Sequence, residues 1–245
     1  MNTRSPILIT GCSRSGMSMV AAAINLFGAF GGKMSYDNQS IRRGMFENVR
    51  IREDLVKPYL SNCGLDVMGQ YPLTIHKNYL YFPDNWKEKV ENILFSEGYK
   101  KGAWMYKDSR TALIWPVWSM SFPDAKWVIV RRRTGDVVDS CVKTGFMKAF
   151  KNESNQHIVG VNNERDGWLW WVHEYEKRFT DMILGGIDHK IIWPERMVDG
   201  DYNQLYELCD WLNLTWNDKS LDFINTLLWN SRIKKGGQNG SKSNS

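Results

Sequence analysis

A glycine- and serine-rich loop near the start of the chain has the spacing of a phosphate-binding loop. The segment 11–18 reads G-C-S-R-S-G-M-S, which matches the G-x-x-x-x-G-x-S spacing of a Walker A loop. It lies between an apolar β run at 7–10 and a helix predicted from about 16 to 26, and backbone N–H groups in that setting form a cradle for anions. Met17 stands where nucleotide kinases and GTPases carry a lysine, and the positive charge lies inside the loop at Arg14. The alternative interpretation is an ordinary strand–turn–helix connection with an incidental arginine.

A second basic segment follows the clearest later β run, at 125–130. Three arginines, 131–133, come directly after this run. Because side chains alternate along a strand, Arg132 shares a face with Val130 and emerges at the carboxyl edge of the sheet. Ser140 lies one to two turns into the next predicted helix and can point back. Two alternatives stay open: a register shifted by one residue makes Arg131 the ligand, and a solvated basic turn binds nothing.

Both segments resemble the signatures of the sulfotransferase superfamily. The loop C-S-R-S-G-M-S resembles the family's P-R-S-G-T-S, with Met17 in place of Thr, and 132–140 resembles its R-x-P-x-D-x-x-x-S, with Thr134 in place of Pro. The resemblance implies that the loop holds the 5′-phosphosulfate of 3′-phosphoadenosine 5′-phosphosulfate (PAPS) and that the second segment grips its 3′-phosphate. The predicted donor-binding residues are Cys12, Ser13, Arg14, Ser15, Gly16, Met17, Ser18, Arg132 and Ser140.

Sulfuryl transfer needs a base for the acceptor's proton and a cation for the departing phosphate oxygen. The segment 43–48 resembles the G-x-x-E element of carboxylate-base sulfotransferases, which makes Glu47 the first candidate base. A surface helix N-terminus also favours glutamate, so a structural role for Glu47 stays open. The segment K-D-S-R at 107–110 resembles the bacterial K-D-P-R element, which makes Lys107 the candidate cation and Asp108 the second candidate base. His76 is the third candidate base, and Arg14 completes the predicted catalytic set.

The elements that position these residues alternate between strands and helices. Strands are predicted at 7–10, 103–106, 125–130 and 190–193, and helices at about 16–26, 46–60, 84–96, 111–120, 136–148, 168–184, 202–212 and 221–229. This order favours an α/β three-layer sandwich, in which a central parallel sheet carries a P-loop-like strand–loop–helix. The segments 27–43, 63–83 and 151–165 are predicted as loops, where acceptor pockets lie.

Composition limits the partners that the chain can have. Of 245 residues, 32 are Lys or Arg and 27 are Asp or Glu, which gives a net charge of +5. Most of this charge lies in the segment 232–245, which we predict to be a disordered basic tail after one domain at 1–231. The domain itself is nearly neutral, which argues against nucleic-acid binding. The four widely spaced cysteines predict neither a disulfide framework nor a zinc site. No apolar stretch predicts a leader or a membrane span, so a cytoplasmic location is expected.

The sequence therefore predicts a PAPS-dependent sulfotransferase, closest to the bacterial carboxylate-base branch, that leaves the product PAP and requires no metal. The acceptor is expected to present a hydroxyl or an amine in line with the donor, and can be a small molecule, a glycan, a lipid or a peptide. Two alternatives are a P-loop nucleotide kinase, against which Met17 counts, and a catalytically inactive PAPS- or PAP-binding protein. The sequence does not predict an oligomeric state.

Overall fold

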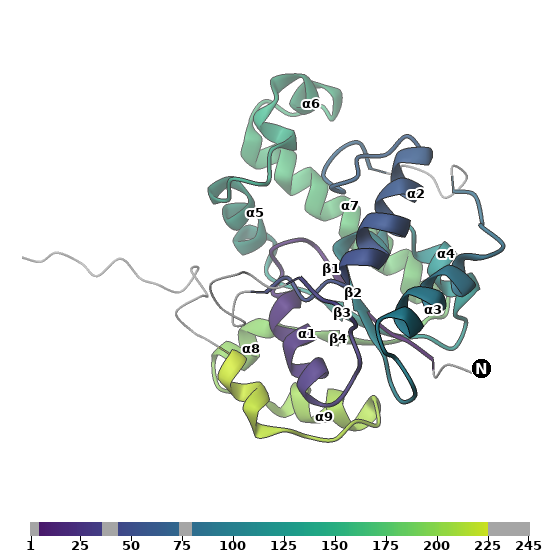
Figure 1. The fold of residues 1–245 in the computed structure, drawn as a ribbon. Coiled ribbons are helices and arrows are strands. Elements are labelled where there is room, and N and C mark those ends of the chain that lie inside the picture. Colours follow the sequence, from purple (N-terminus) through teal and green to yellow (C-terminus); the bar gives the residue numbers. More distant parts are fainter. Residues whose placement is uncertain (1–4, 36–43, 74–79, 225–245) are drawn as a thin grey trace, which may run out of the picture.

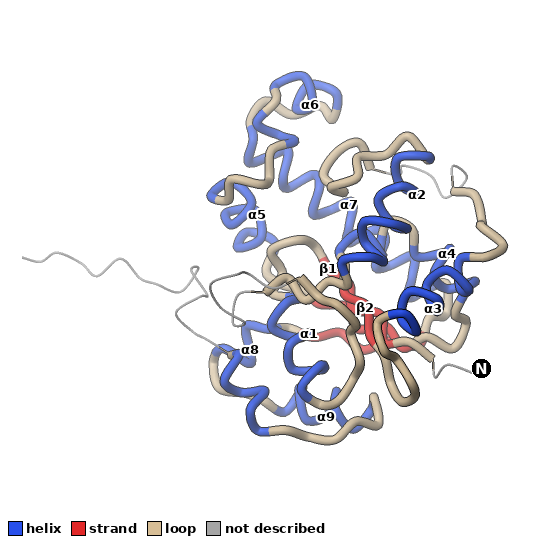
Figure 2. The backbone as a smooth tube through the Cα atoms, viewed as in Figure 1, coloured by secondary structure: helices blue, strands red, loops and turns tan. Residues whose placement is uncertain are grey.

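The centre of the molecule is a four-stranded parallel sheet. The computed structural model describes residues 5–35, 44–73 and 80–224. In strand order the sheet runs β2-β1-β3-β4, and every adjacent pair is parallel. The strands are β1 (Ile7–Gly11), β2 (Met105–Lys107), β3 (Lys126–Val130) and β4 (Asp188–Ile192). The predicted parallel sheet is confirmed, and each strand overlaps its predicted range (Figures 1 and 2).

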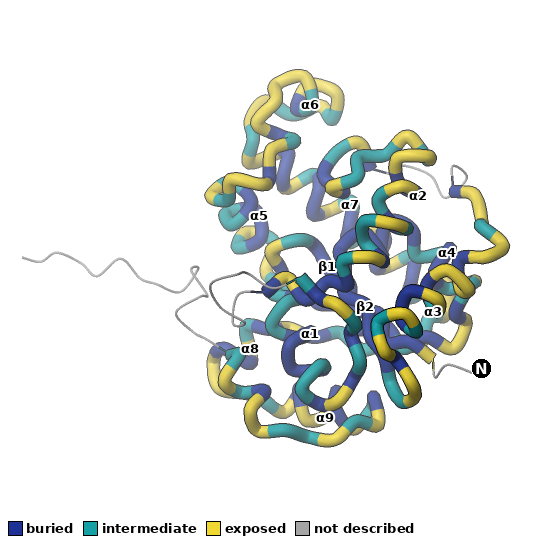
Figure 3. Tube along the Cα trace, viewed as in Figure 1, coloured by how far each residue is buried: buried dark blue, intermediate teal, exposed yellow. Residues whose placement is uncertain are grey.

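Helices cover both faces of this sheet, as predicted for a three-layer sandwich. Leu8 and Ile9 are neighbours on β1 and point to opposite faces. Leu8 lies in a core cluster with buried residues of the helices at 57–62, 86–96, 115–121, 134–143 and 164–184, whereas Ile9 lies in a second cluster with those at 17–26, 194–198 and 203–211. Figure 1 shows the two helical layers on either side of the sheet, and Figure 3 shows the buried strands between them.

The predicted helices agree in part with the structure. Ends that shift by up to five residues separate the predicted ranges from α1 (Met17–Leu26), α3 (Trp86–Ser96), α5 (Thr134–Lys143), α7 (Glu164–Leu184) and α9 (Asn203–Trp211). The helix predicted at 46–60 is reduced to α2 (Lys57–Asn62) at its end, α4 (Trp115–Ser121) covers the second part of the helix predicted at 111–120, and α8 (Pro194–Val198) was not predicted. A π-helical turn, η2 (Ile51–Val56), leads directly into α2. π-helical turns occur frequently at functional sites, and η2 carries Arg52, which contacts Glu47.

The secondary structure predicted for two segments is wrong in detail. The segment 151–165 was expected to be a loop, but it contains α6 (Glu153–Ile158) and the start of α7. Asparagine side chains begin both helices, since Asn152 accepts from the Ser154 N–H and Asn163 from the Asp166 N–H. The predicted helix 111–120 is divided into the 3-10 helix η4 (Ser109–Ala112) and α4, which begins next to Pro116.

The C-terminal part departs from the predicted helix at 221–229. A 3-10 helix, η6 (Asp218–Phe223), occupies the described part of it, and residues from 225 onward, including the predicted tail 232–245, lie outside the described residues. Within the described segments, no helix combines the length and the apolar character that a membrane crossing requires.

Candidate functional site

The carboxyl ends of the parallel strands bring the predicted segments to one edge of the sheet. The register pairs Ile9 with Lys107, Gly11 with Val130, and Val130 with Ile192. The loop that follows β1, the 107–110 segment that follows β2 and the arginines that follow β3 therefore begin side by side. This edge is where ligands bind in open α/β sheets.

The loop 12–16 has the backbone of an anion cradle. Arg14 and Gly16 adopt positive φ angles of 76° and 97°, so the chain turns sharply before α1, whose first N–H groups have no partner within the helix. A side chain at Gly11 would lie 2.4 Å from the Val130 carbonyl and 2.8 Å from Ser15 Oγ, so only glycine fits there. The Ser15 hydroxyl is buried, and within the described segments it has no hydrogen-bond partner. A buried hydroxyl of this kind is suited to a ligand that enters the cradle.

Two predicted loop residues face the core instead of the cradle. Cys12 packs in the cluster with α7, and Met17 packs in the cluster with α1. Burial raises the pKa of the Cys12 thiol well above its ordinary value, so Cys12 stays neutral. Only the backbone of these two residues is therefore available to an anion in the loop.

The basic segment that follows β3 and the helix α5 both contact the loop directly. Arg14 donates from Nε to Ser140 Oγ on α5 at 2.9 Å, and Arg132 donates from Nη1 to the Arg14 carbonyl at 3.0 Å. Arg131 points the other way, to Glu176 on α7 and over the Trp193 ring. The strand alternation thus places Arg132, and not Arg131, against the loop.

Positive charge is concentrated around Arg132. Burial lowers the pKa of its guanidinium, and the neighbouring Arg14 and Arg133 lower it further, while Asp136 and Glu195 act in the opposite direction. A bound anion would relieve the repulsion between these cations.

Glu47 lies at the centre of a cluster of three cations. Its carboxylate is buried and accepts from Lys107 Nζ at 2.9 Å, from Arg52 Nη1 at 3.1 Å and from Arg110 Nη2 at 3.3 Å. The Lys107 ammonium also donates to the Met45 carbonyl at 2.9 Å. The candidate base and the candidate cation predicted from sequence are therefore in direct contact.

The backbone around Glu47 is fixed by pairing and capping. The Glu47 carbonyl accepts from the Ser35 N–H at 2.9 Å, and Asn48 forms an antiparallel bridge with Met34. Asn48 Oδ1 accepts from the Ile51 N–H at 2.9 Å, while its Nδ2 donates to Glu97 Oε2 at 2.6 Å. The residue after Glu47 is thus held at both ends of its side-chain amide, and the Glu47 carboxylate meets Lys107 at the end of β2.

The Asp108 carboxylate accepts hydrogen bonds from residues that lie close to it in the sequence. It is completely buried and accepts from the Arg110 N–H at 2.9 Å, from Arg110 Nε at 2.7 Å and from the Tyr106 hydroxyl at 2.7 Å. Burial raises the pKa of this carboxyl, but Arg110 and the hydrogen bonds outweigh it, so the net shift is downward. Asp108 therefore caps η4 and fixes Arg110, which in turn contacts Glu47.

Replacing Asp108 with Asn should destabilise the fold in a pH-dependent way. Arg110 keeps its contact with Glu47 but loses its closer buried carboxylate partner, which costs on the order of 3–5 kcal/mol near neutral pH. Since the folded-state pKa of Asp108 lies below the unfolded value of about 3.9, its contribution is present above that pH and is lost as the pH falls through the folded-state pKa. Urea unfolding of both proteins should show a constant difference in free energy near pH 7 that narrows below about pH 4. A difference that keeps its size in acid would contradict this role.

Hydrogen bonds from two serines of the loop connect it to the segments that carry Lys107 and Glu47. Ser13 Oγ donates to Ser109 Oγ at 3.1 Å, and Ser18 Oγ donates to the Met45 carbonyl at 3.4 Å. The site residues predicted from sequence thus form two adjoining clusters, with Arg14, Arg132 and Ser140 in one and Glu47 and Lys107 in the other. His76 lies outside the described residues.

Three side chains in these clusters were missed by the sequence reasoning. Arg110 belongs to the K-D-S-R segment but received no role there, and Arg52 lies on the π-helical turn five residues after Glu47. Phe146 lies 5.7 Å from the Arg14 guanidinium carbon, measured to its ring centre. A polar partner 60 residues away, as for Glu47 and Lys107, has no signal in local periodicity.

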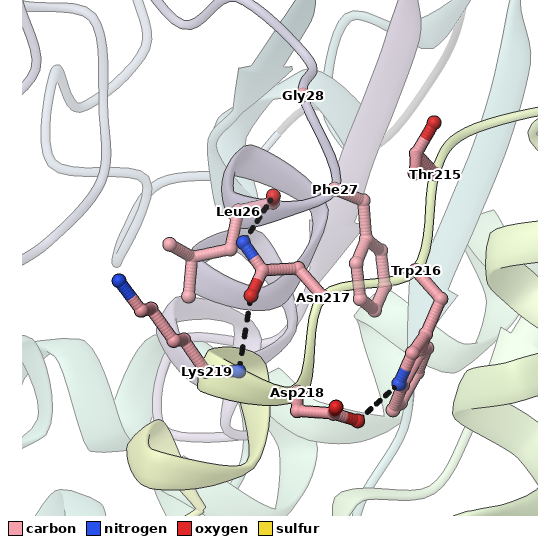
Figure 4. A pocket seen from close by; sticks show the side chains of 8 residues that line it. All are labelled: Leu26, Phe27, Gly28, Thr215, Trp216, Asn217, Asp218 and Lys219. Carbon is pink, nitrogen blue, oxygen red and sulfur yellow. Dashed lines mark hydrogen bonds between the residues drawn. The ribbon is translucent and has the colours of Figure 1, made fainter.

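A cavity of about 620 Å³ lies at the other end of α1 (Figure 4). Two side chains of its lining form hydrogen bonds within it: Asn217 Nδ2 donates to the Leu26 carbonyl at 3.2 Å, and Trp216 Nε1 donates to Asp218 Oδ1 at 2.7 Å. The first of these bonds ties Asn217 to the C-terminus of α1, and the cavity is separate from the residues described above.

Comparison with known proteins identifies the fold. No protein-family model matches the sequence, and no curated protein matches it either. Among solved structures, the sulfotransferase domain from the curacin biosynthetic pathway aligns over 92% of this chain and 79% of its own, with a TM-score of 0.54 and 15% identity. Sulfotransferase STF9 from Mycobacterium avium aligns over 96% of this chain and 70% of its own, with a TM-score of 0.51 and 12% identity.

Proposed function

From the sulfotransferase fold shared with these structures, we propose that the protein is a PAPS-dependent sulfotransferase that modifies a hydroxyl or an amine. The observation that carries this proposal is the junction of Arg14, Ser140 and Arg132, which sets two anion-binding elements side by side. A donor with phosphate groups on both its 5′ and 3′ positions matches such a pair. A simple nucleoside monophosphate would use only one of them.

The residues present suit an anionic donor. An anion would give the buried Ser15 hydroxyl a hydrogen-bond partner, would accept from the backbone of the glycine-containing loop, and would offset the repulsion among the cations around Arg132. Arg14, Ser15, Gly16 and Ser18, with the backbone of Cys12, Ser13 and Met17, would hold the 5′-phosphosulfate. Arg132 and Ser140 would hold the 3′-phosphate. When bound, the donor supplies a sulfuryl group attached to a phosphate leaving group.

Glu47 is the proposed base. The proton of the acceptor O–H or N–H would move to the Glu47 carboxylate as the acceptor atom takes the sulfuryl group, and PAP would leave with the electron pair of the broken bond to sulfur. Lys107 and Arg14 would offset the charge that develops on the departing phosphate oxygen. The acceptor must displace one of the donors that Glu47 now holds.

Glu47 is preferred to Asp108 because of what surrounds each carboxylate. Asp108 is completely enclosed and serves as the cap of η4. Glu47 lies beside the proposed leaving-group cation, at 2.9 Å from Lys107 Nζ. A base must reach the acceptor's proton, so position decides before basicity does.

A nucleotide kinase is the less favoured activity. Its loop lysine would reach the phosphates from position 17, but the Met17 side chain is buried in the core with α1. A protein that binds PAP without transfer is a second candidate, since both Glu47 oxygens are already engaged.

Calorimetry with PAP, AMP and ATP tests the proposal. PAP should bind about 10- to 100-fold more tightly than AMP, because the 3′-phosphate adds charge-assisted hydrogen bonds from Arg132 and Ser140. ATP should bind no better than AMP. Equal affinities for PAP and AMP would remove the roles given to Arg132 and Ser140, and Mg-dependent turnover of ATP would favour the kinase.

A further inference from the structure

Gln70 is a buried polar residue that holds a distant loop. Only 5% of its surface is exposed. Its Nε2 donates to the Phe146 carbonyl at 2.8 Å, and its Oε1 accepts from the N–H groups of Lys148 at 2.9 Å and Ala149 at 3.2 Å. These three hydrogen bonds all go to the backbone of the segment 146–149, which connects α5 to the short helix at 149–151.

That segment carries the ring that lies against Arg14. Phe146 is 49% exposed, and its ring centre lies 5.7 Å from the Arg14 guanidinium carbon, within the range of a cation–π contact. Ser140 holds the Arg14 Nε atom at 2.9 Å. The guanidinium is therefore held by Ser140 and the Phe146 ring together.

The turn that bears Gln70 is itself anchored to the base side of the site. Arg110, which contacts Glu47, donates from Nη1 to the Val67 carbonyl at 3.1 Å. The Gly69 carbonyl accepts from Trp171 Nε1 at 3.0 Å, and a side chain at Gly69 would lie 2.9 Å from Arg110 Cγ. Asp66 accepts three backbone N–H groups within the turn. The segment 66–70 is thus a fixed support between the two clusters.

We infer that Gln70 is a positioning residue for donor binding, which acts through Phe146 to set the Arg14 guanidinium. This inference rests on the proposed function, because it takes the donor to be the ligand of Arg14. Gln70 itself contacts no predicted donor-binding residue in the described hydrogen bonds. Its effect on donor affinity should therefore depend on the ring of Phe146.

A double-mutant cycle on PAP affinity tests the inference. Gln70→Met and Phe146→Ala should each weaken PAP binding about 3- to 10-fold, the size of a partly exposed cation–π contact. The double variant should bind no more weakly than Phe146→Ala alone, because Gln70 has no ring left to position. If Gln70→Met lowers affinity by the same factor in both backgrounds, Gln70 acts by another route and the inference fails.

Gln156 provides the matched control. Gln156 lies on the neighbouring helix α6 and is 7% exposed. Its Nε2 donates to the Phe150 carbonyl at 2.8 Å. Gln156→Met removes the same buried amide without touching 146–149, so it should lower the thermal unfolding temperature while leaving PAP affinity unchanged. A loss of PAP affinity equal to that of Gln70→Met would show a general effect of destabilisation and would overturn the inference.

Because Phe146 is about half exposed, substitutions of its ring should leave the fold intact. Phe146→Tyr retains the aromatic face and should bind PAP like the unmodified protein. Phe146→Leu keeps the bulk but loses the π-face, and should match Phe146→Ala. Tight PAP binding by Phe146→Leu would mean that the ring does not hold Arg14.

A chemical readout separates this inference from the proposed function. Phenylglyoxal modifies accessible guanidinium groups, and peptide mapping by mass spectrometry reports the rate at Arg14. The rate should rise equally in Gln70→Met, Phe146→Ala and the double variant, and should stay unchanged in Gln156→Met. These differences in modification rate are expected even if the protein binds no PAP. Absence of PAP binding would reject the proposed function but not the positioning role of Gln70. An unchanged rate in Gln70→Met would reject the positioning role.

Discussion

Glu47→Gln is expected to lower sulfuryl transfer by about 10²- to 10⁴-fold, the usual contribution of a positioned general base. Glutamine has nearly the same shape and retains an oxygen that can accept from Lys107, but it does not accept the acceptor's proton at neutral pH. The measurement is transfer from labelled PAPS to a panel of phenol, sugar, lipid and peptide acceptors.

The same variant should keep its donor site. Three cations surround Glu47, so removal of the one negative charge makes this side of the site more positive. PAP affinity should therefore stay within a few-fold of the original, or increase. Stability should fall, because Lys107 and Arg110 lose a buried partner, so activities are compared well below the unfolding temperature.

Glu53→Gln is the matched control for this substitution. Glu53 contacts Arg52 at 2.7 Å and Lys57 at 2.8 Å, but it lies on the more exposed side of Arg52 and does not touch Lys107. Its variant should retain transfer within about twofold. Full activity of Glu47→Gln would place the base elsewhere. PAP binding without any transfer, in both the original protein and Glu47→Gln, would favour a binding protein without catalysis.

Arg14→Ala should lower transfer by about 10²- to 10³-fold, as for other removed donors to a developing negative charge. The guanidinium joins both anion elements, so PAP affinity should fall in parallel. Both arginine and alanine carry a Cβ at the positive φ of 76°, so the substitution adds no backbone strain. Single-turnover kinetics with saturating PAPS measure the loss in the chemical step, and calorimetry with PAP measures the loss in binding.

Arg133→Ala separates a specific role of Arg14 from the effect of overall charge. Arg133 belongs to the same basic run, but its side chain is exposed and pairs with Asp136, at 3.5 Å. Its loss should change PAP affinity by a few-fold at low salt and less at high salt. A similar loss of transfer in Arg14→Ala and Arg133→Ala would mean that Arg14 contributes only through the overall positive charge of the site.

The arrangement of the two basic segments follows closely from the sequence. Strand alternation predicted that Arg132 shares a face with Val130, and the structure sets Arg132 against the loop and Arg131 toward α7. Loop spacing alone also located the proposed anion cradle, since Gly11 and Gly16 occupy positions where backbone geometry admits little else.

The acceptor side was harder to predict because its contacts join distant parts of the chain. Glu47 and Lys107 were suggested by family resemblance, but nothing local indicated that Arg52 and Arg110 would share the same carboxylate. Asp108 was the second candidate base until its three hydrogen bonds were known. Gln70 gave no signal, because a buried glutamine in an irregular segment reads as an ordinary loop residue.

The central position of β1 has a consequence for synthesis on the ribosome. This strand is buried along its whole length, yet both of its partners come about 100 residues or more later, since Ile7 pairs with Met105 and with Lys126. At translation rates of about 5–20 residues per second, the strand waits on the order of 5–20 s before either neighbour emerges. During that interval an apolar strand with two open edges is a target for chaperones and for aggregation. Slower translation between β1 and β2 should therefore reduce the soluble yield more than slower translation after β4.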